Sequence, residues 1–397
     1  MLIFCYIEKK VEIYTLTCHN NATINKGANI VSKRRRRPIH KLFMSFCITV
    51  VIILIIIGGV YAAYRGLVRP PDVGDYVIIH LPIANQTIVK EPNSNMSYLL
   101  ADYKPLQEEQ VYEYVRFERR PLFYTILIYG LDDGFNADTI MLAAFDGNTG
   151  QAYLVSLPRD THVESSRGVG RSKLVASYSA GRQGGRGHEG GIELLKTEVA
   201  SLIGFRPDFY VQVNYRAFTR IVDAVGGVSV HIPFRMVYND PYQNLHINLF
   251  PGQHRLNGQQ ALHFARFRQF NEGCPYFRNF TDFQRQANQQ IIITSILNEL
   301  LSTPRNIATI PELVRIYREE VITNMSTLEI AWFVDQASDL LGGSILSSYT
   351  LPIERTERRG WYEMPCKEGI LELVNRTINP FIQDITEEML KVSTTNA

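Results

Sequence analysis

The sequence predicts an α/β domain in which helices flank a central mixed β-sheet, preceded by one transmembrane helix. Three observations predict this fold class. Short β-rich runs alternate with helical patterns over residues 120–355. An uncharged run of 23 residues follows a basic segment near the N-terminus. Hydrophobic residues make up 45% of the chain and charged residues 20%, a composition that argues against a disordered protein.

The uncharged run, residues 42–64, is long enough to cross the roughly 30 Å hydrocarbon core as one helix. Residues 1–41 carry nine Lys and Arg against two Glu. Because positive residues stay on the cytoplasmic side, we expect a cytoplasmic N-terminus and a single-pass protein of the cell membrane, extracytoplasmic from residue 65 onward. The run is too long and begins too late for a cleaved signal peptide. Its basic flank could instead bind nucleic acid, but its position beside the apolar run favours the topological role, so no nucleic-acid partner is expected.

A juxtamembrane stalk is expected after the anchor, over residues 65–117. Five prolines interrupt it, and only residues 76–81 have the pattern of a strand. The α/β domain is then expected over residues 118–355. The remaining residues, 356–397, are expected to form a C-terminal extension.

The domain begins with three short runs that are rich in β-branched and aromatic residues, at 124–129, 139–145 and 151–157. Helical and strand patterns then alternate along the chain. The expected elements are a helix at 191–203, a strand at 209–213, a helix at 215–225, a strand at 228–232, helices at 258–264, 282–301 and 327–341, and a strand at 347–351.

Acidic side chains flank the first predicted loop of the domain. Asp132 and Asp133 follow the first strand and Asp138 opens the second, so the loop would bring carboxylates together at one end of the sheet. Such carboxylates suit a hard cation, most simply Mg²⁺, which binds through one or two carboxylates plus substrate phosphates. The alternative is a turn without a ligand, which Asp-Asp-Gly also favours.

Arginines follow the third strand and close an apolar helix. A proline ends the strand before Arg159 and presents its guanidinium at the sheet edge; a surface salt bridge to Asp160 or Glu164 is the alternative. Residues two apart do not share a helical face, so Arg266 and Arg268 converge only where the helix has ended. Such a pair would clamp an anion; otherwise one of the two is solvated.

Three polar residues of the long helix, Asp282, Arg285 and Gln289, recur at a spacing that places them on one face. Asp282 could also simply cap the helix, because a carboxylate is favoured at a helix N-terminus. Four arginines and these carboxylates describe a site for a doubly phosphorylated group. Rival motifs such as GxSxG or a P-loop are absent from the sequence, and His188 and Glu189 are expected to belong to a glycine-rich loop.

Two of the five cysteines, Cys274 and Cys366, fall in the predicted extracytoplasmic part. They are a candidate disulfide in an oxidising space. Two unrelated thiols are an equal alternative, because the sequence does not show that their Cα atoms approach. The spacing of the cysteines does not match a structural zinc site.

Five motifs occur in order along the chain. They are Asp132 with Asp-Thr-Ile-Met at 138–141, Ser-Leu-Pro-Arg-Asp-Thr at 156–161, Val-Asp-Ala-Val-Gly-Gly-Val at 222–228, Leu-Asn-Gly-Gln-Gln-Ala-Leu at 256–262, and Asp-x-x-Arg-x-x-x-Gln at 282–289. Together they resemble the LytR-CpsA-Psr family, which implies an α/β/α domain. The resemblance also implies a membrane-anchored phosphotransferase that moves a glycopolymer, such as a teichoic acid, from a polyprenyl pyrophosphate carrier to peptidoglycan. Many members also hydrolyse the pyrophosphate lipid.

The resemblance also assigns roles to individual residues. It implies that Asp132 and Asp138 hold Mg²⁺ or Mn²⁺. The residues that it implies bind the pyrophosphate head group are Arg159, Arg266, Arg268, Arg285, Asp282, Gln289 and Lys173. The lipid tail needs an apolar tunnel, for which we expect walls from helices 191–203 and 282–301.

The chain departs from the family pattern at three positions. Asn136 and Asn288 stand where the family commonly has arginine, and Val175 replaces an asparagine. Fewer cationic contacts suggest a second hypothesis, a catalytically weak scaffold that binds the wall or the lipid-linked polymer. Asn136→Arg would then raise activity. A transcriptional regulator is disfavoured, because the anchor places the domain away from DNA.

Overall fold

The computed structural model describes residues 66–89, 108–132, 135–164, 171–271, 273–275, 282–301, 310–339, 346–357 and 360–392. All of them belong to one of the chain's two units, Arg65–Ala397. Within these residues no helix has both the length and the apolar character to cross a membrane. The expected span at 42–64 lies outside the described residues, so the anchor stays a prediction.

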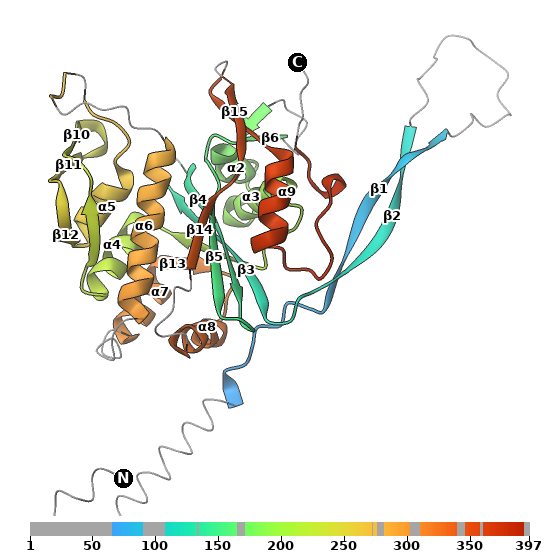
Figure 1. The fold of residues 1–397 in the computed structure, drawn as a ribbon, viewed down its shortest axis with the longest axis horizontal. Helices are drawn as coiled ribbons and strands as arrows, with labels where there is room; N and C mark the ends of the chain where they lie inside the picture. The colour runs from blue at the N-terminus through green and yellow to red at the C-terminus, as the bar shows by residue number, and fades with distance from the viewer. Residues whose placement is uncertain are drawn as a thin grey trace, which may run out of the picture. The chain divides into compact units, whose positions relative to one another are not determined.

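A mixed sheet of six strands forms the centre of the domain, as expected (Figure 1). Strands β3 and β4 are antiparallel, as are β4 and β5, whereas β8 runs parallel to β3, and β14 runs parallel to β5. The short β13 closes the other edge, antiparallel to β8. In spatial order the strands are β13 (Val321–Thr323), β8 (Phe209–Val213), β3 (Phe123–Leu131), β4 (Ala137–Asp146), β5 (Gln151–Ser156) and β14 (Leu346–Thr350).

Helices cover both faces of this sheet, because successive strand residues point to opposite sides. Leu127 and Tyr129 of β3 pack into a core with α3 (Gly187–Ile203) and α9 (Lys367–Thr377). Helix α6 (Asp282–Leu301) lies on the opposite side, as Figure 1 shows. The remaining helices are α2 (Ser177–Gly181), α4 (Tyr215–Ala224), α5 (Gly258–Arg266), α7 (Ile310–Glu320) and α8 (Thr327–Asp339), with 3₁₀ turns η1 (Leu174–Ala176), η2 (Pro241–Gln243) and η4 (Glu387–Met389).

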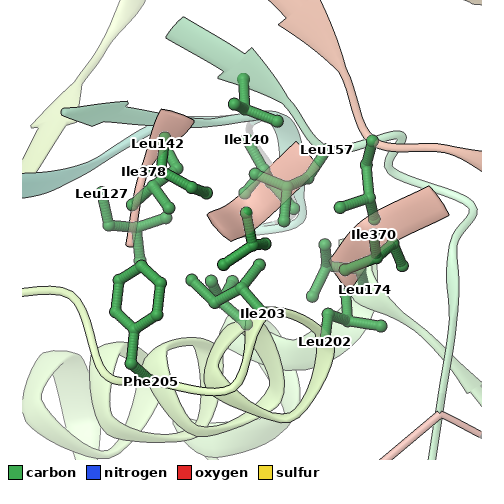
Figure 2. Close-up of a cluster of buried hydrophobic side chains, with 14 of the residues drawn as sticks. Leu127, Ile140, Leu142, Leu157, Leu174, Leu202, Ile203, Phe205, Ile370 and Ile378 are labelled. Carbon is green, nitrogen blue, oxygen red and sulfur yellow. The ribbon is translucent and has the colours of Figure 1, made fainter. Parts of the chain in front are cut away.

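The C-terminal residues are part of the main hydrophobic core and not an appendage to it. Figure 2 shows Ile370 and Ile378 among side chains of the sheet and of α3, such as Leu142 and Ile203. All four side chains are fully buried. The expected boundary at residue 355 therefore does not separate the α9 segment from the domain.

Residues 65–117 contain more structure than expected. Strand β1 (Tyr76–Val89) pairs antiparallel with β2 (Glu108–Glu118), so the expectation of a single short strand was wrong. Prolines were interpreted as breakers, but the pairing accommodates Pro82 through a register shift between Pro82 and Thr87. Proline has no backbone N–H to donate, so it is tolerated where the regular pattern of hydrogen bonds between two strands is interrupted.

A second, smaller core lies beside the sheet and brings two β-ribbons together with α4, α5 and α6. Its strands alternate buried and exposed residues, which is typical of ribbons with one wet face. The strands of the two ribbons are β9 (Val228–Ile232) with β12 (Gly252–Leu256), and β10 (Met236–Asp240) with β11 (Leu245–Leu249). Two further pairs complete the fold, β6 (His162–Glu164) with β7 (Arg171–Lys173), and β15 (Ile353–Glu357) with β16 (Tyr362–Pro365).

The candidate disulfide is not formed, because Cys274 and Cys366 are both free thiols. Cys274 packs against the smaller core beside the β-ribbons. Cys366 precedes α9, whose residues pack into the main core. The two thiols thus belong to different packing clusters, and the alternative of two unrelated cysteines is the correct one.

We predict that Ile370→Ala lowers the free energy of unfolding by about 2–5 kcal/mol, because it leaves a cavity in the main core. The neighbouring exposed Glu372 is the matched control, and Glu372→Ala should change stability by no more than about 0.5 kcal/mol. Denaturant titration of the full-length protein, followed by tryptophan fluorescence, measures both. Equal stability of the two variants would show that α9 is not part of the core.

We also predict that iodoacetamide labels Cys274 and Cys366 when the full-length protein is denatured without a reductant, as mass spectrometry of its peptides would show. Labelling of these two cysteines only after reduction would contradict the structure.

Candidate active site

The two predicted metal ligands flank the segment that connects β3 and β4. The Asp132 carboxylate accepts hydrogen bonds from the backbone N–H of Asn136 at 2.7 Å and from its side-chain amide at 3.0 Å. Asp138 follows at the start of β4, which is antiparallel to β3, so both carboxylates come to the same end of the sheet. Hydrogen bonds typical of a turn are thus present, and two carboxylates lie at this end of the sheet, but the cation stays a prediction. Asp133 lies outside the described residues.

Arg159 reaches this end of the sheet from the turn after β5. Its Nη1 donates to Asp138 Oδ1 at 2.6 Å, and its Nε lies 3.5 Å from Asp160 Oδ2. The surface salt bridge considered from the sequence is therefore present, but Arg159 also binds the predicted metal ligand. Lys173 binds the other oxygen of Asp160, with its Nζ 2.8 Å away.

Helix α5 ends between Arg266 and Arg268, so the two side chains are not held on different faces of one helix. Arg266 is the last residue of α5, and Phe267 has extended backbone angles, φ −63° and ψ 122°. The Phe267 ring is fully buried in the smaller core, while both arginines line the same cavity. The end of the helix that a clamp by both arginines requires is present, Arg268 is exposed, and the clamp on an anion stays a prediction. Arg266 is held further by Gln243, which accepts a 2.8 Å hydrogen bond, and by the Tyr215 ring 4.5 Å below its guanidinium.

Helix α6 contributes a stripe that is polar at its start and apolar further on. Arg285 is buried, and its Nη2 donates to the backbone oxygen of Asp138 at 3.3 Å. One turn on, the Gln289 amide donates to Thr139 Oγ1 at 3.0 Å. Asp282 is the first residue of α6, but its side chain lies outside the described part of the structure.

These groups line one cavity of about 830 Å³. Five cations and three carboxylates face it among the described residues, which leaves a net formal charge of +2. Its polar lining includes eight of the nine predicted binding residues: Asp132, Asp138, Arg159, Lys173, Arg266, Arg268, Arg285 and Gln289. Its apolar lining includes Ile128, Val211, Val213, Phe218, Ile221, Leu245, Leu262, Ala265, Ile293 and Ile296.

The apolar wall differs in part from the one expected. Helix α6 supplies Ile293 and Ile296 as predicted, but the residues of α3 do not line the cavity. Leu195 and Val199 of α3 are fully buried in the main core on the opposite face of the sheet. An amphipathic helix shows in its sequence that it has an apolar face, but not which face of a sheet it covers.

The three departures from the family pattern have different surroundings. Asn136 and Val175 line the cavity, so these two substitutions alter the surface that a ligand meets. Asn288 is buried outside the cavity lining, where its amide donates to the backbone oxygen of Phe264 at 3.2 Å. It bonds an otherwise unpaired carbonyl in the last turn of α5, a structural role.

A polar aromatic group on the other face of β3 was missed from the sequence. His188 is in the first turn of α3 and not in a loop, with its ring nitrogens 2.8 Å from the Tyr178 hydroxyl and 3.5 Å from that of Tyr210. Burial lowers the pKa of His188, and the Arg182 charge adds to the effect. The ring is therefore neutral at pH 7. Burial also raises the pKa of Tyr129, which packs against Tyr178.

The LytR_cpsA_psr family model matches residues 98–376. The regulatory protein MsrR of Staphylococcus aureus (strain COL) is 26% identical over 273 residues, which cover 68% of this chain and 76% of that protein. The polyisoprenyl-teichoic acid–peptidoglycan teichoic acid transferase TagU of Bacillus subtilis (strain 168) is 25% identical over 265 residues, 66% of this chain and 78% of that one.

Solved structures share the fold. TagV of B. subtilis has a TM-score of 0.52 at 22% identity, with 69% of this chain and 99% of that chain covered. The LytR-Csp2A-Psr enzyme from Actinomyces oris has a TM-score of 0.52 at 21% identity, with 65% and 90% covered. These matches show the fold alone, whereas the family model covers well over half of the chain. The chain belongs to the LytR-CpsA-Psr family.

Proposed function

We propose that this protein is a phosphotransferase that moves a glycopolymer from a polyprenyl pyrophosphate carrier to peptidoglycan, and that it can also hydrolyse the pyrophosphate. One observation supports this function above all others: arginines from three separate parts of the chain face one cavity together with three carboxylates and an apolar wall. The relative TagU is named as an enzyme that transfers teichoic acid to peptidoglycan.

The charge of the cavity suits a pyrophosphate. A pyrophosphate esterified at both ends carries about two negative charges, because each phosphoryl group keeps one ionised oxygen. The net charge of +2 on the cavity lining matches it. Planar guanidiniums bind phosphate oxygens through paired hydrogen bonds, so arginine suits this ligand better than lysine.

The two carboxylates fit a divalent cation. Asp132 and Asp138 face the cavity, and no group of three acidic, His or Cys side chains that could hold a metal occurs among the described residues. Mg²⁺ is commonly held by one or two carboxylates, with water and substrate oxygens completing its shell. We therefore propose that Asp132 and Asp138 hold Mg²⁺ or Mn²⁺, which would neutralise charge on the pyrophosphate.

The chain's own residues would then orient and neutralise the reacting group. A hydroxyl oxygen of the peptidoglycan acceptor would attack the phosphorus that bears the glycopolymer. The bond to the bridging oxygen would break, polyprenyl phosphate would leave, and the hydroxyl proton would be released. Phosphoryl transfer depends mainly on positioning and on charge stabilisation, and Arg159 and Arg285 supply both at the sheet end.

The apolar part of the cavity suits the isoprenoid chain. Val211 and Val213 of β8 form one wall, and Ile293 and Ile296 of α6 another. Lipid burial there would place the attached pyrophosphate at the polar end, because the two linings are continuous in one cavity. The expected anchor at 42–64 is part of the same proposal, since it would hold the domain at the membrane that carries the lipid.

The scaffold hypothesis is less well supported by the structure. Of the two positions where a cation is missing, only Asn136 faces the cavity, and five cations remain there. The lining therefore keeps the net positive charge on which the proposed binding of a pyrophosphate depends.

We predict that Arg159→Ala lowers turnover of an isoprenyl pyrophosphate by about 100-fold or more, since it removes a preformed charge contact. The matched control is Arg255→Ala, which breaks an exposed ion pair with Glu299 away from the cavity and should retain activity. Phosphate release by full-length protein in detergent with Mg²⁺ measures both. Equal activity of the two variants, or an inactive wild type, would contradict the proposal.

We also predict that EDTA abolishes this turnover and that added Mg²⁺ or Mn²⁺ restores it. Asp132→Asn should raise the metal concentration needed for half-maximal activity, because it removes one carboxylate from the cation. Titration of each metal into metal-free protein tests this. Full activity in EDTA would exclude a metal-dependent mechanism.

A further inference from the structure

Asp160 lies between two of the cations that face the cavity. One carboxylate oxygen is 2.8 Å from the ammonium of Lys173, and the other is 3.5 Å from Nε of Arg159. Asp160 lines the cavity too, with about a quarter of its side chain exposed. The metal and phosphate roles proposed above do not use it.

The backbone around Asp160 is fixed from several directions. Its carbonyl oxygen accepts from the Glu363 N–H of β16 at 3.0 Å, and the Arg159 carbonyl accepts from the Val175 N–H at 2.8 Å. Within the turn, the Thr161 hydroxyl donates to the Pro158 oxygen at 2.6 Å. The carboxylate therefore projects from a rigid base toward the cavity.

Arg159 and Lys173, in contrast, have long side chains with several rotatable bonds. Each loses conformational entropy when it binds a ligand, and less is lost if it is already held in place. Among the described residues, Asp160 lies within ion-pair distance of both of them. Asp138 lies beside Nη1 of Arg159.

We propose that Asp160 is a positioning residue, which orders Arg159 and Lys173 so that both guanidinium and ammonium face a pyrophosphate. The inference rests on the function proposed above and adds a residue to it. It is not an electrostatic effect on the ligand, because the charge of Asp160 repels an anion.

The two effects of Asp160 on anion binding are opposite, so the direction in which Asp160→Asn changes the affinity distinguishes them. Asp160→Asn keeps the size of the side chain and adds one unit of positive charge to the cavity. Electrostatics alone predicts tighter binding of an anion. Loss of positioning predicts weaker binding, by about 10-fold if two side chains must be ordered afresh.

The test measures binding of inorganic pyrophosphate to full-length protein in detergent by isothermal titration calorimetry. Asp160→Asn is compared with wild type, with Asp160→Glu, and with Glu193→Gln, which neutralises an exposed partner of Arg206 outside the cavity. We expect weaker binding for Asp160→Asn, partial recovery with Asp160→Glu, and no change for Glu193→Gln. Thermal melting of each variant checks that it is folded.

A double-mutant cycle with Lys173→Met identifies the route of the effect. If Asp160 acts partly through Lys173, Asp160→Asn weakens binding less in the Lys173→Met background than in wild type. A general loss of stability caused by Asp160→Asn would be present in both backgrounds. It therefore cancels when the effect of Asp160→Asn in the Lys173→Met background is compared with its effect in wild type.

The outcomes separate the two proposals. Wild type that binds pyrophosphate, with Asp160→Asn binding equally or more tightly, would overturn the positioning role and leave the proposed function intact. Wild type that does not bind pyrophosphate would overturn the proposed function and this inference with it.

Discussion

The contact between Arg159 and Asp138, with 2.6 Å between guanidinium and carboxylate, joins the parts of the candidate site. Asp138 begins the central strand β4, Arg159 follows β5, and Arg285 of α6 donates to the Asp138 backbone. One residue further, Thr139 accepts from Gln289. The start of β4 is thus the point at which α6 is hydrogen-bonded to the sheet. The site depends on how α6 is placed along β4.

This arrangement explains how one cavity can be charged at one end and apolar along its wall. The stripe of α6 that begins with Arg285 and Gln289 continues as Ile293 and Ile296, one or two turns on. An amphiphilic ligand with an anionic head and an apolar tail matches that order. The opposite face of the sheet is filled by the main core, so the cavity is confined to one side.

Local chemistry allowed much of the site to be predicted. The end of α5 between Arg266 and Arg268 follows from the geometry of a helix, and the stripe of α6 follows from its period. The three strands around Asp132 and Asp138 are continuous apolar runs, a pattern that predicts buried strands.

What was missed depends on contacts between distant segments. Strand β2 is stabilised by its pairing with β1, and α9 by burial of Ile370 against the sheet. The state of the two cysteines was left open for the same reason, because only the fold shows that Cys274 and Cys366 belong to different clusters. The hydrogen bonds of His188 likewise join three elements, and no local sequence pattern predicts these hydrogen bonds.

We propose that the cluster at the start of β4 binds a pyrophosphate whose lipid extends along α6. Crystallography of the full-length protein with an isoprenyl pyrophosphate and Mn²⁺ tests it most directly, because anomalous scattering locates the metal. We predict Mn²⁺ beside Asp132 and Asp138, phosphate oxygens within hydrogen-bonding distance of Arg159 and Arg285, and the isoprenoid against Ile293. A ligand that is ordered elsewhere on the protein, with this cavity left to solvent, would contradict the account.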